Sequence, residues 1–322
     1  MPRDCSRTLV AAALAWVGAC PGFAQDRNVP MPAAELERLL RSEPLRIVSA
    51  KISRPKAEGD ITLKAEVAFG DRPALILKIR RAEPGAEVFN NVPRYDLAAY
   101  ELQKLLMDGP EYVVPPTALR MLPLAQLSAW APSARPTFKG ADEVLCVLQY
   151  WLQDVVNPKD VLDPLLLKSD AVYERHVGQL NVLTYLIRHR DSNVGNFLIS
   201  AEPRGARVFA VDNGVAFDSE ESDRGEAWKE MRVKRLPADV VERLRALTED
   251  GLRSRLGVLG QWQLTGGHYL PVPPGSNLAP RSGVRRKGDS VQMGLTEREI
   301  AGVRDRAKRL LGMIDGREIV AF

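Results

Sequence analysis

The chain has 322 residues, of which 45% are hydrophobic and 27% are charged. This is the composition of a globular protein, and the length fits one large domain or two lobes that share a cleft. A net charge of +4 at pH 7 is too small for a chain of this size to indicate nucleic-acid binding. The three histidines have no cysteine partners, so a zinc site is also unsupported.

The first 24 residues have the pattern of a signal peptide. Arg3 and Arg7 precede an uncharged apolar run at residues 8–19, and small residues lead to a cleavage site after Ala24. The apolar run is too short to serve as a transmembrane anchor. We therefore expect an exported protein, periplasmic or secreted.

The cysteines lie mostly in this leader. Lipid attachment at Cys20 is the alternative to soluble export, and it ranks second because Gly18 and Pro21 are atypical of a lipidation site. Cleavage after residue 24 would leave Cys146 as the single cysteine, which excludes an intramolecular disulfide. Cys146 lies in an apolar stretch, so we expect a buried thiol.

Apolar periodicity and turn residues predict strands and helices along the rest of the chain. In chain order, they are a helix at 32–41, an antiparallel meander at 45–52, 61–69 and 74–79, a helix at 93–107, extended segments at 113–119 and 143–152, a helix at 171–187, a strand pair at 197–199 and 208–211, and helices at 237–248 and 297–314.

This order predicts an α+β protein. Residues 25–152 would form a small lobe rich in strands, and residues 153–322 a larger, mainly helical lobe. Thr296 and Glu299 have the spacing of a capping box at the start of the last helix. Residues 261–290 are rich in glycine, proline and polar residues, which predicts a long surface loop.

The strongest chemical signal is the sequence from His189 to Asn196, which fits H-R-D-x-x-x-x-N. In phosphoryl transfer, a carboxylate orients the attacking hydroxyl and an amide oxygen of the same loop binds the metal ion. Asp191 and Asn196 have these residue types, five positions apart. A His-Arg-Asp tripeptide also arises by chance, so the motif alone is a hypothesis.

Two further segments complete the pattern. Asp212 follows an apolar run and precedes Asn213 and Gly214, which places a carboxylate at a strand end where it would hold a divalent ion. Lys78 ends an apolar strand of the meander, from which its ammonium group would reach phosphate oxygens. Asp96 or Glu101, on the next helix, would hold this lysine in place.

Each of these segments taken alone has a simpler interpretation, such as a turn or a solvated lysine. The evidence for a phosphoryl-transfer site is the order in which the segments occur along the chain. The segments 95–116, 188–198 and 211–217 together resemble atypical kinases. The most similar families are the type II phosphatidylinositol 4-kinases, the secretory-pathway kinases of the Golgi casein kinase group, and bacterial relatives. The sequence Asp-Asn-Gly-x-x-Phe, in place of Asp-Phe-Gly, is typical of that branch.

This resemblance implies a two-lobed protein-kinase-like fold that binds ATP with Mg²⁺ or Mn²⁺. Lys78 would contact the nucleotide phosphates, Asp191 would be the catalytic aspartate, and Asn196 and Asp212 would bind the metal. The hinge against adenine would comprise Gln149, Tyr150 and Trp151. The chain departs from the family in having Asp96 where glutamate is usual, and in lacking a glycine-rich phosphate loop at 53–60.

The expected function is transfer of a phosphoryl group from ATP to a hydroxyl acceptor outside the cytoplasm. A protein serine or threonine is the first choice of acceptor, and a lipid headgroup or glycan is the second. A catalytically inactive binding module and a nucleotidyl transferase on the same fold remain as alternatives.

Two charged segments add possible partners. The basic residues in the loop near the C-terminus would attract an acidic protein, a phosphoglycan or an anionic lipid surface, or would simply be solvated. An acidic segment follows Phe217, where kinases have their activation segment. The basic residues are Arg281, Arg285, Arg286 and Lys287, and the acidic residues are Asp218, Glu220, Glu221 and Asp223.

Overall fold

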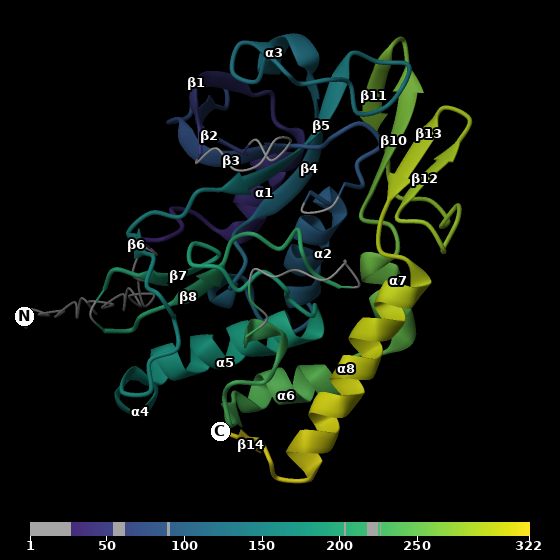
Figure 1. Ribbon diagram of the computed structural model, residues 1–322. Coiled ribbons are helices and arrows are strands. Elements are labelled where there is room, and N and C mark those ends of the chain that lie inside the picture. Colours follow the sequence, from purple (N-terminus) through teal and green to yellow (C-terminus); the bar gives the residue numbers. More distant parts are fainter. Residues whose placement is uncertain (1–26, 54–61, 89–90, 203, 218–224, 226) are drawn as a thin grey trace, which may run out of the picture.

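The computed structural model describes residues 27–53, 62–88, 91–202, 204–217, 225 and 227–322. The predicted signal peptide with Cys20, and the acidic segment after Phe217, lie outside these residues. The described part is a mixed α+β protein, as expected, and its elements are shown in Figure 1.

A five-stranded antiparallel sheet forms the upper part of the molecule in Figure 1, with the strand order β1-β2-β3-β5-β4. Its strands are β1 (Arg46–Ile52), β2 (Thr62–Ala68), β3 (Leu75–Arg81), β4 (Thr117–Pro123) and β5 (Glu143–Tyr150). The predicted meander is therefore confirmed. The predicted extended segment at 113–119 starts before the observed strand, because β4 begins only at Thr117. The N–H groups of Val113 and Val114 instead donate to the side-chain oxygen of Gln103.

Eight α-helices lie in the described part of the chain, and those after residue 170 gather in the lower half of Figure 1. They are α1 (Ala33–Ser42), α2 (Pro93–Gln103), α3 (Leu124–Ser128), α4 (Leu166–Ser169), α5 (Ala171–Leu186), α6 (Ala238–Arg245), α7 (Glu249–Leu256) and α8 (Glu297–Asp315). The capping box of Thr296 and Glu299 is confirmed at the start of α8. Helix α7, which begins at the N-cap Thr248, was not predicted.

Three smaller sheets complete the part of the fold that the structure describes. The first has the order β6-β7-β8, the second pairs β14 with β9 in parallel, and the third has the order β11-β10-β13-β12. Their strands are β6 (Val155–Val156), β7 (Phe197–Ser200), β8 (Val208–Ala210), β9 (Arg235–Leu236), β10 (Gly260–Thr265), β11 (His268–Pro271), β12 (Val284–Lys287), β13 (Ser290–Met293) and β14 (Val320–Ala321).

The prediction of a long surface loop at 261–290 is wrong, because this segment forms most of the third small sheet. The glycines that suggested a loop form the hairpin turns: Gly266 and Gly267 join β10 to β11, and Gly288 joins β12 to β13, all with positive φ. Within the predicted basic loop, Arg285 is buried and donates to four carbonyl groups, including those of Gly257 and Leu295. It is therefore a structural residue.

Two hydrophobic cores cover opposite faces of the five-stranded sheet. Alternate residues of β3, such as Leu77 and Ile79, pack with Leu36 and Leu40 of α1. The other face contributes to a larger core with α2, α5 and α8. Cys146 is fully buried, as predicted, and burial raises the pKa of its thiol.

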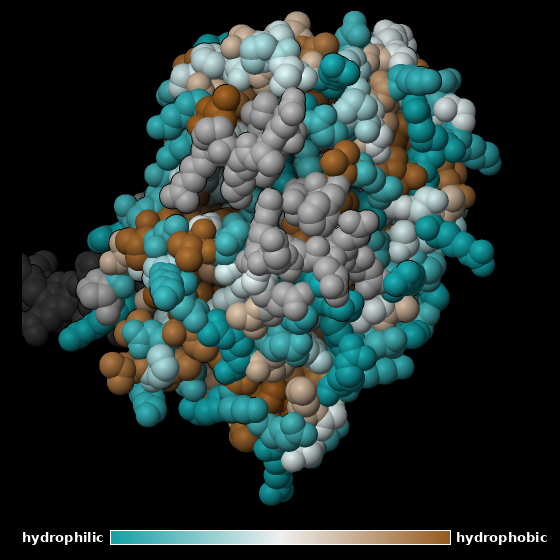
Figure 2. Space-filling model, viewed as in Figure 1, coloured by the Kyte–Doolittle hydropathy of each residue, from teal (hydrophilic) through white to brown (hydrophobic). Residues whose placement is uncertain are grey.

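The molecular surface is mainly hydrophilic on the face shown in Figure 2, where apolar residues form separate groups. Within the described residues, no helix combines the length and the apolar character needed to cross a membrane.

A buried histidine on α5 makes the free energy of unfolding depend on pH. Burial, together with the charges of Arg207 and Arg175, lowers the pKa of His176 from 6.5 to about 3. The unfolded chain takes up this proton below its ordinary pKa, whereas the folded chain does not, so this contribution to stability is lost as pH falls. From pH 7 to pH 5, we expect wild type to lose about 2 kcal/mol more than His176→Gln in urea unfolding. Equal losses in the two proteins would contradict this assignment.

Candidate functional site

Lys78 lies on β3, on the face of the sheet that is opposite to α1. Its Nζ donates a hydrogen bond of 2.9 Å to the carbonyl of Val211, which is 133 residues later in the chain, and lies 3.7 Å from Oδ1 of Asp212. Only 8% of Lys78 is exposed. The predicted lysine and the predicted metal aspartate are therefore in contact, although they come from distant segments.

The loop from His189 to Asn196 is tied to the Asp212 turn by hydrogen bonds. Nε2 of His189 lies 3.0 Å from the carbonyl oxygen of Asp212, and the amide of Arg190 donates to the carbonyl of Val215 at 3.0 Å. Burial lowers the pKa of His189 to about 4, so its ring is neutral at pH 7. The two segments are therefore held together by hydrogen bonds, and the Asp212 turn also contacts Lys78.

Asn196 forms hydrogen bonds with Asp191 in its own loop and with Val211, the residue before Asp212. Its Nδ2 donates to the backbone carbonyl of Asp191 at 2.9 Å, and its own carbonyl accepts the amide of Val211 at 3.0 Å. Because Nδ2 is committed to Asp191, Oδ1 of Asn196 is the atom that would serve as a metal ligand. Asp191 itself is buried, with 3% exposed.

The donor set suits Mg²⁺ or Mn²⁺ when nucleotide is present. Asn196 would supply an amide oxygen and Asp212 a carboxylate, and Mg²⁺ is commonly held by one or two such protein ligands together with phosphate oxygens. No cluster of three or more histidine, cysteine, aspartate or glutamate side chains that would hold a metal by itself occurs among the described residues. The fit therefore depends on phosphate.

Arg80 is the residue of this site that the sequence interpretation missed. Its Nη1 donates to Oδ1 of Asp212 at 2.7 Å and lies 3.7 Å from Oδ2 of Asp96. Strand alternation could have identified Arg80. Successive residues of a strand point to opposite faces, so Arg80, two positions after Lys78, lies on the same face as Lys78. Arg80 lies outside the motifs at 189–196 and 212–214 on which the sequence interpretation depended.

The two carboxylates proposed to hold Lys78 have different neighbours. Glu101 faces away from the site and forms ion pairs with Arg41, Lys104 and Arg255. Asp96 lies at the site, with 1% exposed, and accepts the amide of Asn213 at 3.0 Å. Burial raises the pKa of Asp96, against the opposing charges of Lys78 and Arg80. Its direct ion-pair partner is Arg80.

No model of a known protein family matches this chain, and no curated protein matches it.

The predicted hinge residues follow one another at the end of β5. The side chain of Gln149 donates to Oγ1 of Thr117 at 2.9 Å. The amides of Tyr150 and Trp151 donate to the carbonyls of Pro116 and Ile76, both at 3.0 Å. These two amides are therefore used within the sheet, and a backbone donor for adenine would have to come from residues after Trp151.

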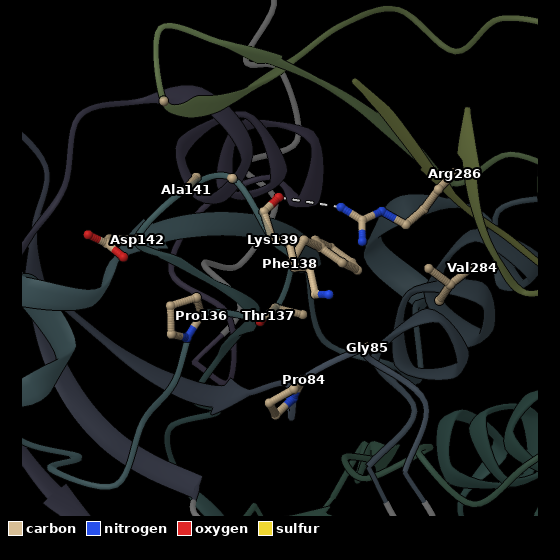
Figure 3. A pocket seen from close by; sticks show the side chains of 12 residues that line it. Pro84, Gly85, Pro136, Thr137, Phe138, Lys139, Ala141, Asp142, Val284 and Arg286 are labelled. Atoms are coloured by element: carbon tan, nitrogen blue, oxygen red, sulfur yellow. Dashed lines mark hydrogen bonds between the residues drawn. The ribbon is translucent and has the colours of Figure 1, made fainter. Parts of the chain in front are cut away.

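A pocket in the described part of the chain lies away from these residues. It has a volume of about 870 Å³ and lies beside β12. Figure 3 shows its side chains, including Arg286, which donates to the carbonyl of Lys139 at 3.4 Å. Two further pockets, of about 720 and 470 Å³, are likewise not lined by Lys78, Asp191, Asn196 or Asp212.

Proposed function

We propose that this chain is an ATP-dependent phosphotransferase that acts on a hydroxyl acceptor. The observation that carries the proposal is the contact of Lys78 with the turn at Val211 and Asp212, which is bonded in turn to the loop of Asp191 and Asn196. Phosphoryl transfer requires little covalent chemistry from the protein, but it does require charges in fixed positions. This arrangement is suited to that requirement.

The four residues would have separate roles. Lys78 would contact the nucleotide phosphates, and the Asp191 carboxylate would orient the acceptor hydroxyl and take its proton. Asn196 and Asp212 would hold the divalent ion, which would neutralise charge on the phosphates when bound.

The proposed fold is two-lobed and kinase-like. In its support, the five-stranded sheet and α2 precede residue 152, whereas α5 to α8 follow it. The sheet of β10 to β13 adds contacts across this division, because Tyr269 donates from its amide to Oε2 of Glu143 at 2.7 Å and from its hydroxyl to the carbonyl of Lys139 at 2.8 Å. These hydrogen bonds would connect the two proposed lobes on one side of the molecule.

The proposed acceptor is a protein serine or threonine, followed by a lipid headgroup or a glycan. With the leader of residues 1–24, the reaction would occur outside the cytoplasm, where ATP is scarce and a separate nucleotide source is required. The mass of the product distinguishes phosphoryl transfer from nucleotidyl transfer, since the first adds a phosphoryl group and the second adds AMP.

One observation favours a second candidate, an inactive kinase-like binding module. Asp212 already forms a 2.7 Å ion pair with Arg80, which places a protein cation on the carboxylate proposed to bind the metal. A protein that never binds a metal ion would tolerate this arrangement permanently.

Nucleotide binding decides between the two candidates. We expect ATP with Mg²⁺ or Mn²⁺ to raise the melting temperature of the chain from Gln25 onward, and we expect Asp212→Ala to abolish the rise, because it removes the only carboxylate assigned to the metal. The measurement is a thermal shift titration with each metal and with ATP alone.

Asp71→Ala is the matched control, because Asp71 is an exposed aspartate in the turn before β3. This variant should retain the full rise in melting temperature. Absence of any shift at millimolar ATP with either metal would favour the binding module, and a shift that persists in Asp212→Ala would remove Asp212 from the site.

A further inference from the structure

A row of polar side chains crosses the five-stranded sheet at the level of Lys78. Residues that lie directly opposite one another on neighbouring antiparallel strands have their side chains on the same face. Lys51 of β1 lies opposite Lys64 of β2, which lies opposite Lys78 of β3. Three lysines on adjacent strands therefore share one row, which continues through Gln149 of β5 to Thr117 of β4.

This row lies on the face of the sheet that carries the candidate site. On β2, Leu63 and Ala65 are buried in the core that includes α1, so Lys64 between them points to the opposite face. Lys78 points to that face too, where it contacts the turn of Val211. Lys64 is therefore the neighbour, on the next strand, of the lysine proposed to bind phosphate.

The row concentrates positive charge that the described part of the chain does not neutralise. Like charges directly opposite one another on neighbouring strands destabilise a sheet. Lys78 has the carboxylate of Asp212 at 3.7 Å, whereas Lys51 and Lys64 form no ion pair within the residues that the structure describes. An exposed lysine on an edge strand such as β1 protects the edge from aggregation. Lys64 is half-buried on an interior strand, so edge protection does not account for it.

Lys64 lies between the two ends of the proposed nucleotide site. Its Nζ stands over the ring of Trp151, 4.4 Å from the ring centroid, and Trp151 belongs to the proposed hinge. A nucleotide with its base at the hinge and its phosphates at Lys78 would pass Lys64. A cation–π contact at a partly exposed position is weak, so the ammonium group of Lys64 is able to turn towards a bound anion.

We infer that Lys64 is a second phosphate-binding lysine of the proposed nucleotide site, and that its ammonium group pairs with phosphate oxygens of ATP beside Lys78. This inference rests on the proposed function. A lysine ammonium offers three donors and a compact charge to phosphate oxygens. The segment at 53–60, immediately before β2, has a single glycine and lacks the backbone cradle of a glycine-rich loop. Side-chain charge on β2 would supply what that loop does not.

The test is calorimetric titration of the full chain with ATP in the presence of Mg²⁺ or Mn²⁺. Lys64→Met should weaken ATP binding about tenfold, the change expected when one charge-assisted contact is lost. Lys64→Arg should restore most of the affinity, because arginine keeps the charge and the donors. Weakening in Lys64→Met that Lys64→Arg does not restore would contradict a role that depends on charge.

Two controls separate a contact with phosphate from other effects. Lys287→Met removes an exposed lysine from β12, in another sheet, and should leave ATP affinity unchanged, which excludes an effect of net charge. Without nucleotide, Lys64→Met should melt at or above the wild-type temperature, because it relieves the repulsion within the row. A lower melting temperature would instead indicate that Lys64 supports the sheet.

Failure of the proposed function has a different signature. If wild type binds no ATP with either metal, the nucleotide site is rejected and the role of Lys64 is rejected with it. If wild type binds ATP and Asp212→Ala does not, but Lys64→Met binds ATP as tightly as wild type, only the role of Lys64 is rejected.

Discussion

Replacing Asp191 by asparagine should lower the rate of phosphoryl transfer about 100- to 10,000-fold, the usual contribution of a general base. Asparagine has the same shape, but its amide cannot take the proton of the acceptor hydroxyl. The bond from Asn196 to residue 191 goes to a backbone carbonyl, so the loop should keep its structure. The measurement is ADP formation, with nucleotide binding followed in parallel by thermal shift.

The same loop offers a control for this variant. Asn193 is exposed, and Asn193→Ala should retain both binding and turnover. An Asp191→Asn protein that turns over ATP at the wild-type rate would remove Asp191 from the catalytic role. Loss of nucleotide binding in Asp191→Asn would instead show that this residue supports the site structurally.

Replacing Glu299 by alanine should lower the free energy of unfolding by about 3 to 5 kcal/mol, as expected when one partner of a buried ion pair is removed. Glu299 accepts from Arg94 at 2.6 Å, from the hydroxyl of Tyr95 and from the amide of Thr296 at 2.7 Å. Burial would raise the pKa of Glu299, but the hydrogen bond and charge of Arg94 hold it below its usual range. The measurement is urea unfolding at pH 7.

Glu297 provides a comparison within the same helical turn. It forms a 2.9 Å ion pair with Arg253 at the surface, so Glu297→Ala should cost less than about 1 kcal/mol. Glu299→Gln should lie between the two, because glutamine can still cap α8. Equal losses for Glu297→Ala and Glu299→Ala would contradict the view that burial of the pair with Arg94 makes the difference.

Much of the fold could be predicted because its signals are local. The meander at β1 to β3, helix α5 and the pair β7–β8 each follow from apolar spacing and from the turn residues between them. The sheet of β10 to β13 was not predicted, because its closely spaced hairpin turns give this segment the high glycine and proline content of a loop. Arg285 shows the same limit: besides two carbonyls of its own loop, its guanidinium binds the carbonyls of Gly257 and Leu295, and no local pattern reveals these more distant contacts.

The candidate site divides in the same way. The loop of Asp191 and Asn196 and the turn of Asp212 are short motifs that the sequence displays directly. The ion pairs of Arg80 with Asp212 and Asp96 join three separate segments, so their existence depends on how β3, α2 and β8 pack. The choice between Asp96 and Glu101 was open for the same reason, because both lie on α2 and only packing shows which of them faces the sheet.

The bond from Lys78 to the carbonyl of Val211 has a consequence for folding. Closing a segment of 133 residues is entropically unfavourable, and contacts of such long range slow the folding of a domain. The Asp191 loop and the Asp212 turn, close in sequence, can associate before the five-stranded sheet docks on them. The proposed nucleotide site would be complete only once the sheet has docked, and a ligand of this site would then bind the native protein but not the unfolded chain.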